Sequence, residues 1–156
     1  MSCGQYPSRA VTGETLTVRA TVFREGHDAV ACNVAVTDPQ GKAGPFRRMT
    51  PGEPGTDRWY APIIVDGEGE WTFVVEGWSD PLGTWWHDAP LKVDADVDTD
   101  LMLEEGARLY ERAAKALPKE VGKAARLSVS GLADVLRDAS RTPQERMKLA
   151  LADDVV

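Results

Sequence analysis

The hydrophobic pattern of the chain changes its period near residue 94, and this change constrains the fold more than any other feature. Before it, apolar and polar residues alternate, as in TLTVRATVF (15–23), where Leu16 and Val18 share a face. A period of two is typical of a strand that is buried on one side. After residue 94, apolar residues recur every three or four positions, which is the period of an amphipathic helix. The sequence therefore predicts a β part followed by a helical part.

Five runs in the first part predict β strands. They are residues 15–23, 30–36, 58–64, 71–78 and 84–93, separated by turn-rich segments such as TPGEPGTD and VDGEGE. The tight VDGEGE connection predicts that 58–64 and 71–78 form a hairpin. In the last run, period two places Trp85 and Val93 on the inner face and Trp86 on the outer face. Pro90 has no N–H, so this strand is expected to lie at a sheet edge or to be interrupted there. Alternation also makes Cys32 a small core residue.

The second part predicts two to three helices. An amphipathic stripe that includes Met102 and Leu109 indicates a helix over 98–117, in which Asp98 or Asp100 caps the first turn. A further helix spans about 119–138. A third begins at Thr142, where Thr-Pro-Gln-Glu matches a capping box with proline at the first helical position. The expected domain organisation is therefore a β-sandwich over 1–93 and a helical segment over 94–156.

Charge and composition exclude two classes of partner. The net charge of -7 argues against nucleic-acid binding, because such proteins concentrate Lys and Arg on one face. No apolar run approaches the roughly 20 residues that a membrane-spanning helix needs. Cys3 and Cys32 lie in dissimilar settings, and no signal peptide precedes them. We therefore expect a cytoplasmic protein with reduced thiols.

No group of residues in the sequence predicts catalysis, a metal site or a cofactor site. His27-Asp28 and His87-Asp88 are adjacent pairs, and neighbours on a strand point to opposite faces, so neither pair is expected to chelate an ion. Asp66, Glu68 and Glu70 are expected to be solvated turn charges, because paired-carboxylate catalysis needs two groups that face each other across a cleft. The chain also lacks a glycine-rich phosphate loop after a strand.

The tryptophans are the remaining candidate site residues. Trp71 and Trp85 are predicted to fill the core of the β part, where each large ring would bury roughly 150–250 Å². Trp78 ends its strand, and Trp86 points outward if 84–93 is a strand. These two rings are the candidates for stacking on a sugar. The alternative is that these two rings are covered, either by the helices of the same chain or by the surface of a partner.

Four motifs in order resemble a known family. They are FREGHDAV (23–30), PGTDRWYA (54–61), EGWSDPLGTWWHDAPLKV (76–93) and DLMLEEGARLYERAA (100–114). Together they are similar to the N-terminal domain of the α-1,4-glucan:maltose-1-phosphate maltosyltransferases of the α-amylase superfamily. One position departs from the family pattern, since Trp86 stands where arginine is expected after the TW motif.

The resemblance implies a mainly β fold, an immunoglobulin-like β-sandwich with an appended C-terminal segment of two to three α-helices. It also implies a parent enzyme that transfers maltosyl units from maltose 1-phosphate to α-1,4-glucan. The catalytic carboxylates of that enzyme are expected in a catalytic barrel outside this chain. The partners it implies are the remainder of that enzyme and a second copy in a homodimer. The abrupt DDVV ending is expected for a chain cut before the barrel. This chain is then expected to be a non-catalytic domain, or alternatively a module that binds α-glucan on Trp78 or Trp86.

Overall fold

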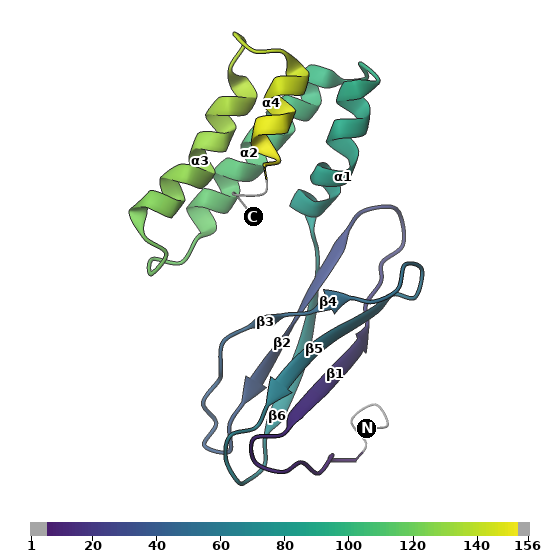
Figure 1. Cartoon of the computed structure of the whole chain (residues 1–156), viewed down its shortest axis with the longest axis vertical. Helices are drawn as coiled ribbons and strands as arrows, with labels where there is room; N and C mark the ends of the chain where they lie inside the picture. Colours follow the sequence, from purple (N-terminus) through teal and green to yellow (C-terminus); the bar gives the residue numbers. More distant parts are fainter. Residues whose placement is uncertain (1–5, 153–156) are drawn as a thin grey trace. The chain divides into compact units, whose positions relative to one another are not determined.

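The computed structural model describes residues 6–152 of the chain (Figure 1). The chain divides into two compact units between Ser79 and Asp80. We call them the β unit and the helical unit. This division falls earlier in the chain than the expected boundary after residue 93, which depended on a strand over 84–93.

The β unit contains two antiparallel sheets of three strands. One has the order β1-β5-β4 and the other β3-β2-β6. The strands are β1 (Thr15–Thr21), β2 (Val30–Thr37), β3 (Arg47–Arg48), β4 (Thr50–Pro51), β5 (Arg58–Ile64) and β6 (Thr72–Ser79). The predicted strands at 15–23, 30–36, 58–64 and 71–78 are confirmed to within two residues at each end.

The predicted hairpin between 58–64 and 71–78 is wrong. β5 pairs with β1, so that Val18 lies opposite Ala61, whereas β6 pairs with β2, so that Val34 lies opposite Val75. The 65–71 connection therefore crosses from one sheet to the other. Turn composition indicates where a strand ends, but the choice of partner strand depends on contacts far away in sequence.

Both sheets contribute to one buried cluster in the β unit. Its members are aliphatic side chains and two sulfur-containing ones: Val18, Cys32, Val34, Met49, Ala61 and Ile63. Cys32 is fully buried and unpaired, as the alternation predicted. Trp71 is not in this cluster, contrary to the prediction that it is a core residue. It lies half-buried in the loop before β6.

The predicted strand over 84–93 is also wrong, because these residues form helix α1 (Pro81–Asp94). Asp80 is the N-cap, and its carboxylate accepts a 2.9 Å hydrogen bond from the Gly83 amide, while Pro81 takes the first helical position. The buried residues of α1 are Trp85, Ala89 and Val93. A spacing of four satisfies the helical period and the strand period alike, so alternation could not separate the two.

Three further helices follow: α2 (Thr99–Ala116), α3 (Lys123–Arg137) and α4 (Pro143–Ala150). All three of these helices were predicted. With α1, which was predicted as a strand, the described residues contain four helices. The capping box at Thr142 and Glu145 is present. Asp98 is the N-cap of α2 but makes no side-chain cap hydrogen bond, because its backbone is left-handed with φ of 51°. The helices contain more of the described residues than the strands do, so the fold is mixed α and β and not mainly β.

Trp85 lies in the core of the helical unit and not in a β core. Its ring is 3% exposed and its Nε1 donates a 2.7 Å hydrogen bond to the Met102 carbonyl. The ring meets Tyr110 edge to face, with centroids 5.8 Å apart. The rest of this core comes from all four helices, including Leu103, Leu136 and Met147. In residues 6–152, none of the helices has the length and apolar character that crossing a membrane requires.

Candidate functional site

The two His-Asp pairs make different contacts in the structure. His87 and Asp88 lie on α1, and the Nδ1 of His87 is 2.8 Å from the Asp88 carboxylate with both side chains exposed to solvent. The expectation that the pair points apart fails because the segment is a helix. Asp28 instead forms a 3.0 Å ion pair with Arg24. Across the described range 6–152, no three His, Cys, Asp or Glu side chains are grouped so as to hold a metal ion.

Trp86 does not point outward as the strand prediction required. It is partly buried against the helical core, and its Nε1 donates a 3.0 Å hydrogen bond to the hydroxyl of Tyr110. That hydroxyl donates in turn to the Ala150 carbonyl at 2.6 Å. Burial raises the pKa of Tyr110, so the hydroxyl keeps its proton at neutral pH. The indole edge of Trp86 therefore joins α1 to α2 and, through Tyr110, to the end of α4.

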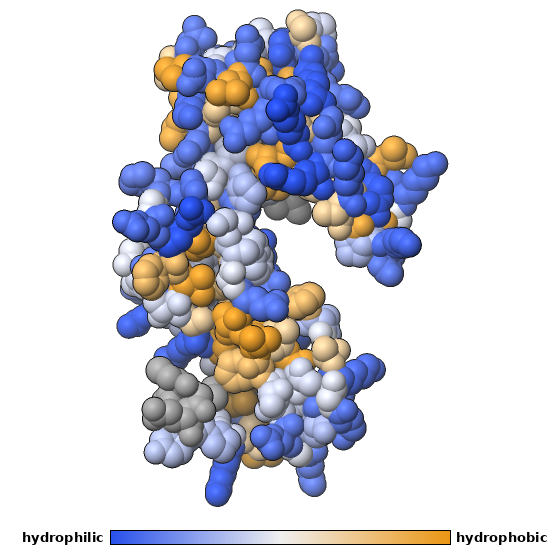
Figure 2. Space-filling view, turned by 180° about the vertical axis from the view of Figure 1, so that it is seen from behind, coloured by the Kyte–Doolittle hydropathy of each residue, from blue (hydrophilic) through white to orange (hydrophobic). Residues whose placement is uncertain are grey.

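Trp78 is exposed on β6. It lies opposite Ala31 of β2, and 38% of its surface is accessible. Phe73 and Val74 of the same strand are exposed by 40% and 53%. Figure 2 shows hydrophobic side chains gathered on a face of the β unit, whereas on the helical unit they are scattered among hydrophilic ones. Of the two tryptophans that the sequence singled out, the structure leaves only Trp78 as an exposed ring.

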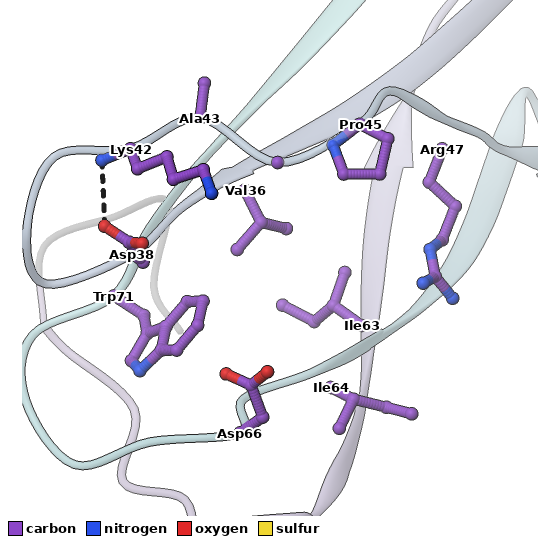
Figure 3. A pocket seen from close by; sticks show the side chains of 11 residues that line it. Val36, Asp38, Lys42, Ala43, Pro45, Arg47, Ile63, Ile64, Asp66 and Trp71 are labelled. Carbon is purple, nitrogen blue, oxygen red and sulfur yellow. Dashed lines mark hydrogen bonds between the residues drawn. The ribbon is translucent and has the colours of Figure 1, made fainter.

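A pocket in the β unit brings together residues that the sequence did not connect (Figure 3). Its volume is about 360 Å³, and it is bordered by Val36 of β2, Arg47 of β3 and Ile63 of β5. The 38–45 segment and the 65–71 loop complete it. The pocket lies at the point where the chain crosses between the two sheets, so strands of both sheets supply its walls.

The pocket combines apolar walls with charges of both signs. Trp71 contributes its ring, and its Nε1 donates a 3.0 Å hydrogen bond to the Gly67 carbonyl, which fixes the orientation of the indole. Lys42 and Arg47 supply cations and Asp66 supplies a carboxylate. Within residues 6–152 no ion pair or side-chain hydrogen bond engages these three charged groups.

Asp38 also lines the pocket, but its carboxylate has a structural task. It accepts a 2.8 Å hydrogen bond from the backbone amide of Lys42 (Figure 3) and one of 2.9 Å from that of Gln40. These bonds close the turn at the pocket edge. Asp66, Glu68 and Glu70 are exposed, as the sequence predicted. One signal for this site is present in the sequence, a tryptophan directly after a glycine-rich acidic loop, although strand alternation predicts that its ring lies in the core.

The chain matches known proteins over its whole length. A family model described as alpha-1,4-glucan:maltose-1-phosphate maltosyltransferase, domain N/S, matches residues 1–156. The chain is 50% identical over 152 residues to alpha-1,4-glucan:maltose-1-phosphate maltosyltransferase 1 of Streptomyces coelicolor, covering 97% of this chain and 22% of that protein. It is 48% identical to maltosyltransferase 2 of the same organism, again over 152 residues with 97% and 22% covered.

A more distant relative gives the same assignment. The alpha-1,4-glucan:maltose-1-phosphate maltosyltransferase of Mycobacterium tuberculosis is 35% identical over 190 residues, covering 99% of this chain and 25% of that protein. The chain thus spans about a quarter or less of the length of these curated relatives. The resemblance that the four sequence motifs indicated is confirmed. The chain belongs to the alpha-1,4-glucan:maltose-1-phosphate maltosyltransferase family, and it corresponds to the part of these proteins described as domain N/S.

Proposed function

We propose that the chain is the non-catalytic N-terminal structural and dimerisation domain of a maltosyltransferase, which transfers maltosyl units from maltose 1-phosphate to α-1,4-glucan. The observation that carries this proposal is the match to domain N/S over residues 1–156 in proteins of which the chain covers only 22% to 25%. The partner of the domain is then the remainder of the same enzyme, including its catalytic barrel, and the site of action is the cytoplasm.

The proposed fold of the β unit is an immunoglobulin-like β-sandwich. Two antiparallel sheets that share one buried cluster support it, since the inner faces of a sandwich interdigitate in this way. Cys32 supports a reducing location, because it is buried and unpaired in the described part of the chain.

Strand β6 supports the dimerisation role. It is an edge strand of eight residues whose described neighbour in the sheet is β2 alone. Exposed apolar residues such as Val74 and Trp78 stand on it without the lysines or prolines that protect sheet edges in monomers. We infer that this edge contacts a second copy of the chain.

The mass of the purified 156-residue chain in solution, measured by light scattering, tests dimerisation. We expect the mass of a dimer, and the mass of a monomer for a Val74→Lys variant. A Val11→Lys variant is the control, because Val11 is an exposed valine outside the strands, with 73% of its surface accessible against 53% for Val74. The mass of a monomer at all protein concentrations would contradict the proposed dimerisation role. Extension of glucan from maltose 1-phosphate by the same chain would contradict the non-catalytic role.

A second proposed function is that of a carbohydrate-binding module that stacks α-glucan on exposed tryptophan. Trp78 favours it, because its ring is exposed on the same face of β6 as the exposed polar residue Glu76. Trp86 does not favour it, since its ring packs against the helical core and its Nε1 is engaged by Tyr110.

A further inference from the structure

We propose that the pocket at Trp71 binds a neutral α-linked glucose oligomer, and that this pocket, not the Trp78 surface, is the saccharide site of the β unit. The inference rests on the proposed function for the choice of α-glucan as the saccharide. It is carried by three features of the pocket: a fixed aromatic ring, the charged side chains of Lys42, Arg47 and Asp66, which have no ion pair or side-chain hydrogen bond to the described residues 6–152, and two loops that are packed together.

The fixed ring of Trp71 meets the first requirement of a sugar site. Sugar rings bury their apolar C–H faces on aromatic side chains, and the apolar surface continues here over Ile63 and Val36 (Figure 3). The hydrogen bond from Trp71 to the Gly67 carbonyl holds the indole in place before a ligand arrives. A binding group that is already ordered loses little conformational entropy on binding.

The charged side chains of the pocket suit a neutral ligand that both donates and accepts hydrogen bonds. A sugar hydroxyl donates to a carboxylate such as that of Asp66 and accepts from a cation such as Lys42 or Arg47. Hydrogen bonds to charged groups are about twice as strong as those between neutral groups. The carboxylates of Asp66 and Asp38 balance the two cations, so the pocket carries no excess of positive charge to select an anion such as phosphate.

The two loops that border the pocket are packed together. Gly69 has a φ of 129°, and a Cβ at this position would lie 2.7 Å from the Pro39 ring. Pro39 belongs to the turn that Asp38 closes, so the 65–71 loop and the 38–42 turn hold each other at one end of the pocket. The volume of about 360 Å³ lies within the range of roughly 300–1,000 Å³ that small-molecule sites occupy. It suits a short oligosaccharide segment.

Calorimetric titration of the full 156-residue chain with maltoheptaose tests the proposal. We expect binding that weakens by about tenfold or more in Trp71→Ala and by several-fold in Asp66→Asn. Phe23→Ala is the control, since it removes an exposed aromatic ring that does not line the pocket and should leave the affinity unchanged. Trp71→Phe keeps an apolar ring in place, so it should retain a measurable part of the affinity.

Nuclear magnetic resonance of the indole N–H groups supplies a second readout that does not depend on the stability of the variants. Maltoheptaose should shift the Trp71 signal and leave the Trp85 signal, which lies in the helical core, in place. The absence of any binding at millimolar maltoheptaose would overturn the proposal. So would binding that Trp78→Ala abolishes and the Trp71 variants retain. The structural and dimerisation role is tested separately, by the solution mass and the transfer assay. The failure of the saccharide site can therefore be told apart from the failure of that role.

Discussion

The indole of Trp85 occupies the space that a side chain at position 106 would need. A Cβ added to Gly106 would overlap the six-membered ring of Trp85, which crosses from α1 onto the backbone of α2. A glycine inside a helix costs about 1 kcal/mol relative to alanine, so the close packing of this ring must offset that cost. The same contact explains how Trp85 reaches the Met102 carbonyl at 2.7 Å.

We therefore expect Gly106→Ala to destabilise the chain by about 1–3 kcal/mol, although alanine is the better helix former, because the added methyl group displaces Trp85. Gly131→Ala is the control. It lies inside α3 with open space around the position of a Cβ, so it should stabilise the chain by about 0.5–1 kcal/mol. Urea unfolding of both variants measures the difference. Equal gains in stability at the two positions would show that Trp85 does not pack on Gly106.

The second prediction concerns the hydroxyl of Tyr110. Tyr110→Phe leaves the Trp86 Nε1 without its acceptor and the Ala150 carbonyl without its donor, and both groups are wholly or partly buried. Unsatisfied buried groups cost about 1–3 kcal/mol, so the free energy of unfolding should fall by that amount. Hydrogen exchange should also become faster in α4, because Tyr110 no longer holds its last residue. Unchanged exchange in α4 would mean that the hydroxyl does not tether this helix.

The third prediction concerns pH. Hydrogen bonds from Arg137 and then Arg108 hold the pKa of Glu104 down at about 2. A depressed pKa in the folded state contributes stability above the ordinary pKa of glutamate, roughly 4.3, and this contribution is lost as the pH falls toward about 2. Stability should therefore decrease over this interval, and it should decrease less in Arg137→Gln. Arg137 belongs to α3 and Glu104 to α2, so the pair joins two helices.

The control for the pH experiment is Arg112→Gln. Arg112 is an exposed arginine of α2, and no ion pair joins it to another residue in the described range. Its variant should show the same acid dependence as the unmodified chain in thermal unfolding at several pH values. Identical acid dependence in Arg137→Gln would contradict the role of the Glu104–Arg137 pair.

The fourth prediction concerns the buried thiol of Cys32. Burial raises the pKa of this thiol, so little reactive thiolate is present at neutral pH, and no surface of the residue is exposed. In a Cys3→Ser background, a thiol reagent should label Cys32 only as fast as the β unit unfolds. The labelling rate should rise with denaturant. Labelling of the native chain at the rate of a free cysteine would show that the β core opens locally.

Some features of this protein follow from local sequence alone. Strict alternation identified β1 and β2 and the inward position of Cys32, because the two-residue period of a strand leaves one face buried. The capping box at Thr142 and Glu145 fixed the start of α4, since its hydrogen bonds lie within four consecutive residues. Four motifs in order were also enough to identify the family.

Other features depend on the tertiary structure. Trp85, Ala89 and Val93 are spaced by four, which fits one face of a strand and one face of a helix, so the spacing could not decide between them, and in the structure this face packs in a core that includes Met102. The partners of β5 and β6 likewise depend on contacts between residues far apart in the sequence. Trp71 lines a pocket because the chain crosses from one sheet to the other beside it. Local patterns determine which face of an element is buried, whereas long-range contacts determine what covers that face.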